Sequence, residues 1–426
     1  MINAVDTVWV LISGALVLLM TPGLAIFYGG MVRSKSALNM IMMSFSTIGV
    51  ITVLWVFYGY SLAFGPDAFG GFVGDLSHIG LNGAVMELVG SEGHQIPSAA
   101  FVMFQLTFAI VTTALLSGAV ADRISFKGWL VFISVWFTIV YAPLAHMAFA
   151  AQGGTGGLFI DRIGALDFAG GTAVEINSGA SALALALVVG KRIGFKKDPM
   201  RPHNLPLVLL GAGLLWFGWF GFNAGSALAV TGTATVAMIN TQISTAVAAI
   251  AWIAVETKRD GKPTTLGIAS GAIAGAVGIT PACGYVSPLG AMVVGLLAGT
   301  FCSIAVGLKY KLGYDDSLDV VGVHGVGGIV GMISIGLLAT NSVNDSIRNG
   351  LLNGGDFSLM SDQLIAIAIT AVYAFCATAL IAKVIDKFIG LRVDAETEIS
   401  GVDTSLHAES AYDFTGVGGA GHLGRG

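Results

Sequence analysis

The chain has 426 residues, of which 55% are hydrophobic and only 11% are Asp, Glu, Lys or Arg, and its formal net charge is -5. Soluble proteins carry about 25% charged residues, so this composition is too poor in charge to cover a water-exposed surface. It excludes a soluble enzyme, and the lack of a basic excess excludes a nucleic-acid binder. A disulfide scaffold is excluded because Cys283, Cys302 and Cys376 all lie in apolar runs.

Long stretches without a charged residue indicate transmembrane helices, each of which needs roughly 20 apolar residues. Such stretches run over 7–32, 36–66, 93–121, 128–160, 202–255 and 263–308. Apolar runs between turn-forming or charged segments predict eleven spans, at 8–30, 38–64, 100–121, 129–150, 168–190, 205–227, 235–256, 265–283, 288–308, 320–340 and 362–388. The chain is therefore predicted to be an all-α polytopic membrane protein.

The distribution of basic residues predicts the orientation, because Lys and Arg accumulate in loops on the cytoplasmic side. Of the 20 Lys and Arg residues, all but Arg162 and Arg348 fall in loops after odd-numbered spans or in the C-terminal tail. We therefore expect the N-terminus outside and the C-terminus inside.

Glycine spacing predicts close packing of the helices. The 60 glycines include Gly267, Gly271 and Gly275, which recur every four residues and would form a ridge of small residues on one helix face. Such ridges let helix backbones approach closely in a membrane.

Two ionisable side chains lie deep within predicted spans, where a charge costs roughly 2.5 to 3.5 kcal/mol and usually has a function. Glu175 lies in the fifth span, eight residues after Asp167, and His324 lies in the tenth span, eight residues after Asp316. The matched offsets suggest two inverted five-helix repeats followed by an eleventh helix. In such folds the pathway runs between the repeats, so Glu175 and His324 would face each other near the midplane.

A plainer interpretation assigns His324 to helix packing and Glu175 to a protonated carboxyl bonded to a backbone carbonyl. The matched offsets argue against two unrelated buried groups.

Aromatic residues near polar groups form a further pattern, although aromatic side chains are common in any membrane core. Phe108, Phe149 and Phe222 each lie near the outer end of a span. Their polar neighbours are Gln105, Thr107, His146, Asn223 and Ser226. A ring face attracts a desolvated cation by roughly 0.5 to 2 kcal/mol, so a few rings and a hydroxyl would select a cation without holding it tightly.

Several stretches resemble the ammonium transporters of the Amt/Mep/Rh superfamily, and of its Amt branch in particular. They are TPGLAIFYGG (21–30), FQLTFAIVTTALLSGAVADR (104–123), YAPLAHM (141–147), ALDFAGGTAVEINSGASALALALVVGKR (165–192), PHNLP (202–206), WFGWFGFNAGSA (216–227), GITPACGY (278–285), DVVGVHGVGGIVG (319–331) and GLRVDAETE (390–398). The stretch from DFAGG to GKR is the most specific of these.

The resemblance implies a homotrimer in the cell membrane with one narrow apolar pore in each subunit. By motif, Phe108, Ser226 and position 149 would form an outer recruitment site, with Asp167 organising it from behind. Phe108 and Phe222 would be a stacked gate. His324 would be one of two hydrogen-bonded pore histidines, and the other falls at position 175.

The chain departs from the family pattern at two of these positions. Glu175 stands where most members have the first pore histidine, and Phe149 stands where bacterial members usually have Trp. We therefore expect transport of ammonium, and less well of methylammonium, with a proton relay formed by Glu175 and His324.

The resemblance also divides the chain into a membrane domain at 1–389 and a cytoplasmic regulatory tail at 390–426. We expect the tail at 389–413 to pack under neighbouring subunits and to respond to a PII-type signalling protein, and the glycine-rich end at 416–426 to be disordered. No cofactor, metal or nucleic-acid partner is expected.

Three alternatives remain open at this point. An ion-coupled symporter would need unwound segments within its spans, whereas DFAGGT and GVHGVGG are typical of continuous helices. An intramembrane protease using Ser178 or Ser226 with His324 lacks a GxSG turn. A neutral-gas channel or a membrane sensor of ammonium is the third alternative.

Overall fold

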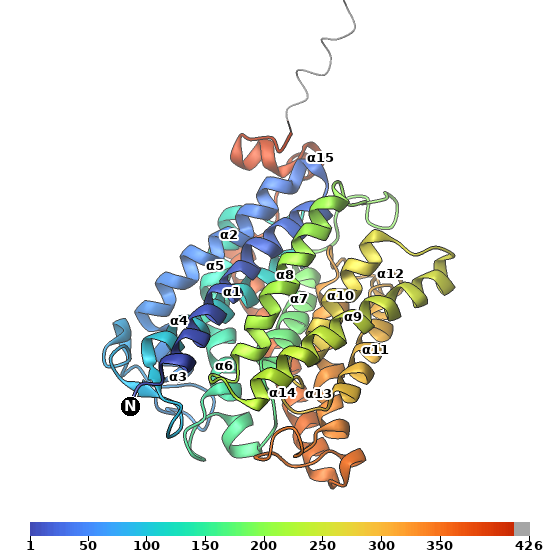
Figure 1. Ribbon diagram of the computed structural model, residues 1–426. Helices are drawn as coiled ribbons and strands as arrows, with labels where there is room; N and C mark the ends of the chain where they lie inside the picture. Colours follow the sequence, from blue (N-terminus) through green and yellow to red (C-terminus); the bar gives the residue numbers. More distant parts are fainter. Residues whose placement is uncertain (413–426) are drawn as a thin grey trace, which may run out of the picture.

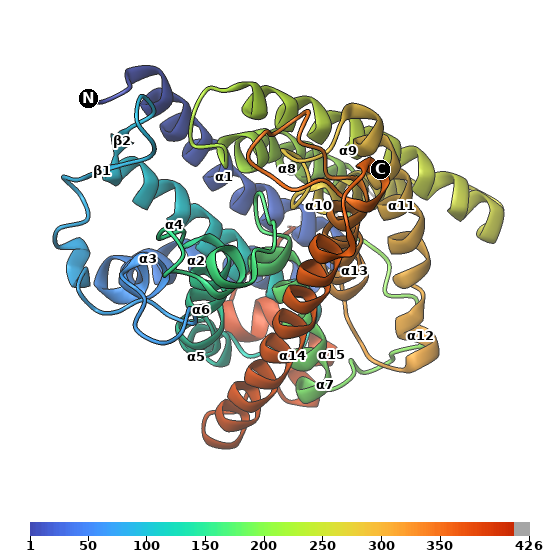
Figure 2. The ribbon, with the colours of Figure 1, turned by 90° about the horizontal axis from the view of Figure 1, so that it is seen from below.

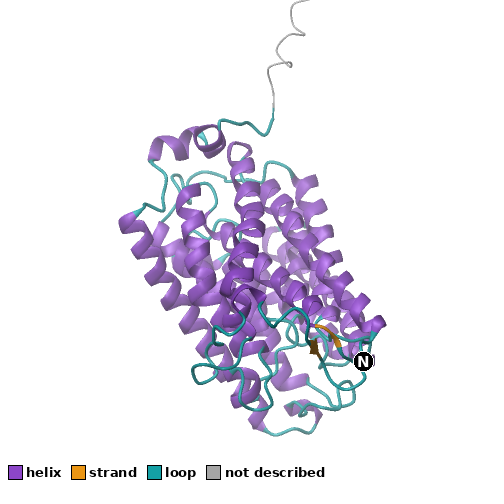
Figure 3. Cartoon of the chain, turned by 90° about the vertical axis from the view of Figure 1, so that its left-hand side faces the viewer, coloured by secondary structure: helices purple, strands orange, loops and turns teal. Residues whose placement is uncertain are grey.

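The computed structural model describes residues 1–412, and their regular structure is almost entirely helical. The helices form one elongated bundle, with the N-terminus at one end and the short helix α15 (Ala395–Ser400) at the other (Figure 1). Strands β1 (Leu88–Val89) and β2 (Ile96–Pro97) pair as a small hairpin at the N-terminal end (Figure 3).

Ten helical segments in the described chain are long and apolar enough to cross a membrane. Four are single helices: α1 (Ala4–Met31), α8 (Leu205–Gly225), α9 (Gly232–Asp260) and α14 (Phe357–Phe388). Two combine a helix with a short extension at its end: α4 (Ser98–Leu115) with a 3-10 turn (Leu116–Val120), and α11 (Pro288–Ala305) with α12 (Leu308–Leu312).

The other four contain a π-helical turn. They are α2 (Ala37–Leu54), Trp55–Gly59 and α3 (Tyr60–Phe64); α5 (Phe126–Trp136), Phe137–Tyr141 and α6 (Ala142–Phe149); Gly171–Ile176 and α7 (Asn177–Val189); and Val321–Gly325 and α13 (Val326–Leu338).

The remaining apolar helix is α10 (Thr265–Ile279), which has 15 residues and packs against both α9 and α11. Each of the predicted spans therefore contains an apolar helix, and ten reach a spanning length. The expected glycine ridge is also present on α10. A Cβ atom at Gly271 would lie 2.6 Å from Cβ of Trp252, and one at Gly275 would lie 2.5 Å from Cβ of Ala248, so only glycine allows α9 to approach this closely.

The prediction that DFAGGT is a continuous helix was wrong. The chain turns sharply at Gly170, whose φ of 121° favours glycine, and the π-helical turn begins only at Gly171. GVHGVGG is continuous, because the π-helical turn Val321–Gly325 leads directly into α13. Viewed along the bundle, α14 crosses the outside of the other helices and packs against both α7 and α13 (Figure 2).

Candidate functional site

A cavity of about 360 Å³ opens at the end of the bundle that carries the N-terminus, and it is called the outer cavity here after the orientation expected from the sequence. The residues expected at an outer cation site line it together. Phe108 comes from α4, Phe149 from the end of α6, Ser226 from the residue after α8, and Asp167 from the turn before α7. The fold thus gathers these side chains from four separate segments of the chain.

Two polar groups of the outer cavity are free to accept hydrogen bonds. The hydroxyl of Ser226 donates to the carbonyl oxygen of Phe222 at 2.8 Å, which leaves the lone pairs of its oxygen available. Gln105 also lines the cavity, and its Oε1 is buried without a hydrogen-bond partner among the described residues. Both atoms suit a cation that carries N–H groups.

The carboxylate of Asp167 is fully engaged by its own turn. Oδ1 accepts from the backbone N–H groups of Gly170 at 2.8 Å and Gly171 at 2.7 Å. Oδ2 accepts from the backbone N–H and the hydroxyl of Thr172, at 2.7 and 2.5 Å. These four bonds cap the π-helical turn that leads to Glu175, as an N-cap carboxylate does for an α-helix.

Two stacked phenylalanine rings close the inner side of the outer cavity. Phe108 and Phe222 have ring centroids 4.0 Å apart with 24° between their planes, and both side chains are buried. Phe108 lines the outer cavity, whereas Phe222 lines a second cavity further in. A solute would therefore have to displace these rings to pass from one cavity to the other.

The inner cavity is narrow, at about 20 Å³, and nearly all of its lining is apolar. Its ionisable groups are Glu175 and His324, whose Oε2 and Nδ1 atoms are 2.6 Å apart. The two residues are 1% and 4% exposed. The remaining lining residues are Met20, Leu24, Phe27, Val111, Leu115, Val174, Leu215, Trp219, Phe222 and Ile273.

Glycines bring the helices of this pair together. A Cβ atom at Gly179 would lie 2.2 Å from Cα of Gly325, and one at Gly328 would lie 2.8 Å from Cβ of Glu175. Real side chains cannot approach so closely, so α7 and α13 reach the hydrogen-bonding distance of Glu175 and His324 only because glycines occupy these positions.

The segment before His324 repeats the geometry of the segment before Glu175. The Oδ2 atom of Asp316 accepts from the backbone N–H of Val321 at 2.7 Å, and the third residue after it, Asp319, has a positive φ of 66° like Gly170. Burial raises the pKa of Asp316 to about 6, although the charge of Lys309 lowers it. The sequence offset of eight residues thus corresponds to two similarly capped helix starts.

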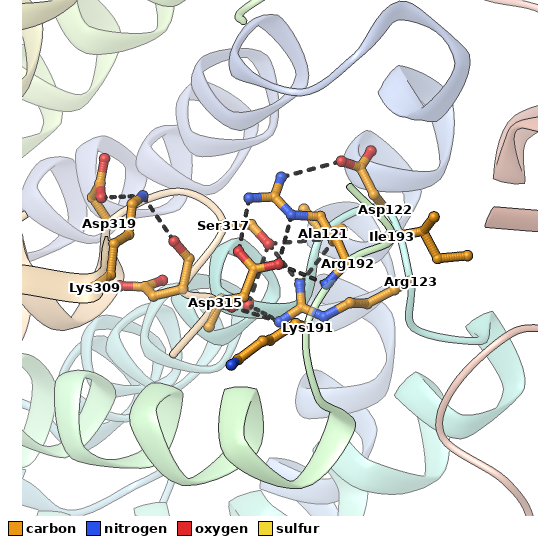
Figure 4. Close-up of polar contacts among 12 residues, drawn as sticks. Ala121, Asp122, Arg123, Lys191, Arg192, Ile193, Lys309, Asp315, Ser317 and Asp319 are labelled. Carbon is orange, nitrogen blue, oxygen red and sulfur yellow. Dashed lines mark hydrogen bonds and ion pairs between the residues drawn. The ribbon is translucent and has the colours of Figure 1, made fainter. Parts of the chain in front are cut away.

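A buried cluster of charges lies near α15, at the opposite end of the bundle from the N-terminus, because Glu398 of α15 accepts from the backbone N–H of Ile193, next to Arg192. Figure 4 shows the polar contacts of this cluster. The guanidinium of Arg192 bonds Asp315 at 2.9 Å and Asp122 at 3.3 Å, and Arg123 donates to Ser317 at 2.6 Å. Burial raises the pKa of Asp315, but the hydrogen bond from Arg192 and the charges of Arg123 and Arg192 lower it by a larger amount. The pKa of Asp315 therefore lies below its usual value. No local pattern in the sequence groups these residues, because Arg192 and Asp315 lie 123 positions apart.

Beside this cluster, a cavity of about 600 Å³ opens at the same end of the bundle. Its lining includes Met31 at the end of α1, Lys196 and Lys197 in the loop before α8, and the ion pair of Lys309 with Asp319, in which Nζ and Oδ1 are 2.5 Å apart.

The described part of the C-terminal tail lies against the same end of the bundle. Arg392 donates to the carbonyl oxygens of Val189, the last residue of α7, and of Lys191 just beyond it, at 3.1 and 2.7 Å. The carboxylate of Asp403 accepts from the backbone N–H groups of Leu38 and Asn39 at the start of α2, at 3.0 and 2.8 Å. The expectation for 416–426 lies outside the described residues.

Comparisons with known proteins match most of the length of this chain. The family model described as Ammonium Transporter Family matches residues 8–412. An ammonium transporter of Mycobacterium tuberculosis is 52% identical over 441 residues, which cover 97% of this chain and 91% of that protein.

Two solved structures are similar along most of the chain. The crystal structure of Saccharomyces cerevisiae Mep2 has a TM-score of 0.85 and 33% identity, and the match covers 93% of this chain and 88% of that one. The structure of a sensor Amt protein has a TM-score of 0.85 and 26% identity, and its match covers 94% of this chain and 98% of that one.

Proposed function

The chain belongs to the ammonium transporter family, and from this membership we propose that it recruits NH₄⁺ at the outer cavity, deprotonates it and passes ammonia through the inner cavity. It is a multi-pass membrane protein of the cell membrane. The observation that carries the proposal is the inner cavity, whose apolar lining is interrupted only by the hydrogen-bonded pair of Glu175 and His324.

We propose that eleven helices cross the membrane, with α10 as the eighth span, the N-terminus outside and the C-terminus inside. The two similarly capped helix starts at Asp167 and Asp316 support two inverted five-helix repeats followed by α14. We further propose a homotrimer with a membrane domain at 1–389 and a cytoplasmic tail at 390–426.

At the outer cavity, Phe108 and Phe149 would offer ring faces to the cation while Ser226 and Gln105 accept its N–H groups. Asp167 would contribute its negative charge from behind, because both of its oxygens are held by backbone and hydroxyl donors. This combination would bind ammonium weakly enough to release it toward the stacked rings of Phe108 and Phe222.

Beyond the rings, an ion would lose its water without finding ligands, which costs several kcal/mol or more in an apolar medium. Ammonium avoids this cost because it can lose a proton and continue as neutral ammonia. The carboxyl of Glu175 and the imidazole of His324 would take up and relay that proton. The pair would titrate as a unit rather than as two independent groups.

Selectivity between ammonium and potassium tests the proposal. Purified protein in liposomes on a capacitive sensor is expected to give a transient current after an ammonium jump and a smaller one with methylammonium, whereas K⁺ gives none because it has no proton to lose. Protein-free liposomes are the control. A sustained potassium current as large as the ammonium signal would contradict the proposed pathway.

An ion-coupled symporter is disfavoured by the inner cavity, which at about 20 Å³ is too small for an organic solute. A membrane sensor of ammonium is not favoured either, because relatives that match 96 to 97% of this chain, such as those of Mycobacterium tuberculosis and Bacillus subtilis, are named ammonium transporters.

The ring at position 149 is expected to limit affinity for ammonium. Phe149 borders the outer cavity and also a neighbouring cavity of about 340 Å³, which gives room for a larger ring. Because indole offers the strongest cation-π face, Phe149→Trp should lower the half-saturating ammonium concentration about threefold. Concentration series of the ammonium current in the wild type and the variant measure this. An unchanged or higher value would assign position 149 to packing.

We propose that the tail links the three pores to a cytoplasmic PII-type signalling protein. The cavity of about 600 Å³ beside the charged cluster supports this proposal, since it would accept a protruding loop of such a partner. The bonds from Arg392 to the end of α7 would transmit binding at the tail to the helix that follows Glu175.

Truncation after Lys387 is therefore expected to reduce the ammonium current several-fold and to abolish co-purification of a PII protein from nitrogen-replete cells. Truncation after Tyr412 is the matched control, because it preserves the described tail contacts and should behave like the full chain. If truncation after Lys387 changes neither transport nor co-purification under any nitrogen condition, the tail has no regulatory role.

A further inference from the structure

A second outer cavity of about 340 Å³, here called the side chamber, lies next to the outer cavity. The two cavities share the lining residues Phe101, Phe149, Ala151 and Leu228, so they are separated by little more than the ring of Phe149 and its neighbours. None of the roles proposed above for the outer cavity, the gate or the relay uses the side chamber.

Aromatic rings form much of the wall of the side chamber. Tyr60 and Phe64 come from α3, Phe101 from α4 and Phe149 from α6. The rings of Phe64 and Phe101 have centroids 4.9 Å apart at 80°, so they form adjoining walls, and Tyr60 lies 5.6 Å from Phe64. Rings set at different angles around one space are the arrangement that recognises alkylated ammonium ions.

An imidazole provides a hydrogen-bond acceptor in the same chamber. The side chain of His94 lines the chamber and is 42% exposed, and its Nδ1 lies 2.8 Å from Oδ2 of Asp6, whose side chain is 2% exposed. The other oxygen of Asp6 accepts from the backbone N–H of Val230 at 2.7 Å. Because a carboxylate can only accept a hydrogen bond, the neutral imidazole carries its proton on Nδ1, and its Nε2 keeps a lone pair.

The Nε2 atom has no hydrogen-bond partner among residues 1–412. The chamber therefore combines ring faces with one unused acceptor, and it lies beside the cavity where we propose that cations are recruited. A volume of about 340 Å³ also exceeds what a small organic ion requires, leaving room for several waters of about 30 Å³ each.

We propose that the side chamber binds small alkylammonium ions that retain an N–H group, such as trimethylammonium. The methyl groups would lie against Tyr60, Phe64 and Phe101, and the N–H would donate to Nε2 of His94. Bound next to Phe149, such an ion would hinder access of ammonium to the outer cavity. This last consequence rests on the proposed function, whereas binding itself does not.

The test is isothermal titration of the purified full-length protein in detergent at pH 8, where an ordinary imidazole is neutral. Trimethylammonium is the probe, and tetramethylammonium is the matched probe without an N–H group. Three variants distinguish binding in the side chamber from binding in the outer cavity. Phe64→Leu removes a ring that lines only the side chamber, His94→Ala removes the acceptor, and Ser226→Ala changes only the outer cavity.

Wild-type protein is expected to bind both probes saturably. Phe64→Leu should raise the dissociation constant of both about tenfold, as loss of one desolvated ring face implies. His94→Ala should raise the dissociation constant of trimethylammonium about tenfold, because this probe loses its hydrogen bond to the imidazole. The dissociation constant of tetramethylammonium, which has no N–H group, should change by no more than about twofold. Ser226→Ala should change neither. The ammonium current of Phe64→Leu, expected to match the wild type, shows that this variant is folded.

Absence of saturable binding would overturn the proposal, as would a loss in Ser226→Ala equal to that in Phe64→Leu, which would assign the probe to the outer cavity. Equal responses of both probes to His94→Ala would overturn the acceptor role. The binding result can be interpreted separately from the transport result. Binding without any ammonium current would refute the proposed function alone, and a normal current without binding would refute the side chamber alone.

Discussion

Replacement of Glu175 by Gln is expected to reduce the ammonium-evoked current at least about 100-fold, the size of effect that a positioned acid–base group has on proton transfer. The amide keeps the shape of the carboxyl and still bonds Nδ1 of His324, which lies 2.6 Å from the carboxyl oxygen in the native pair. It cannot take up or release a proton. Current measurements on a capacitive sensor between roughly pH 5 and 8, where histidine chemistry titrates, provide the test.

Glu175→His is the matched variant, because it restores the residue that most of the family has at this position. It is expected to retain transport with an altered pH dependence, since two imidazoles replace a carboxyl and an imidazole. Size-exclusion chromatography of both variants checks assembly. If Glu175→Gln conducts like the wild type at every pH in this range, the carboxyl carries no proton and only orients His324.

Asp167→Asn is expected to lower the ammonium current at least about tenfold and to lower thermal stability. The carboxylate accepts four hydrogen bonds, and an asparagine can still accept those of Gly170 and Gly171. The amide nitrogen of the asparagine then faces the backbone N–H of Thr172, at the start of the helix that carries Glu175. Both groups are donors, so the N–H of Thr172 loses its acceptor. An unsatisfied group of this kind costs about 1 to 3 kcal/mol.

Asp316→Asn offers a control at the corresponding position eight residues before His324. One oxygen of Asp316 accepts from Val321, whereas Oδ1 is buried without a partner among the described residues. Asparagine can place its carbonyl oxygen toward Val321, and burial already raises the pKa of Asp316 to about 6, so loss of the charge is mild near that pH. We expect a change within about twofold. Equal effects of Asp167→Asn and Asp316→Asn in transport assays and thermal melts would contradict this account.

The sequence predicted the features that depend on burial of polar groups in a membrane. Glu175 and His324 stood out because ionisable residues within apolar runs are rare, and the structure brings them within 2.6 Å of each other. The eight-residue offsets from Asp167 and Asp316 correspond to two carboxylates that cap helix starts. The helices themselves followed from runs of apolar residues, whose lengths leave few alternatives.

Other features had no signal that could be interpreted from sequence alone. Leu24, Val111 and Trp219 line the inner cavity, but an apolar residue facing a pore looks the same as one facing lipid. The turn at Gly170 depends on where the carboxylate of Asp167 points, and the helical pattern of the following residues concealed it. The side chamber arises from loops and helix ends that are distant along the chain, so no local pattern marks it.

The buried charge cluster at the far end of the bundle has a mechanical consequence. Asp122 follows the third spanning segment, Arg192 follows α7, and Asp315 precedes α13. Arg192 pairs with both carboxylates, and its ion pair with Asp315 fastens the first half of the chain to the second. Removing one partner from a buried pair typically costs about 3 to 5 kcal/mol, and separating the partners would expose the same uncompensated charges. Large rocking of one half against the other would have to break these bonds in every cycle. The scaffold is therefore suited to passage through a fixed frame in which only side chains such as the stacked phenylalanines swing aside.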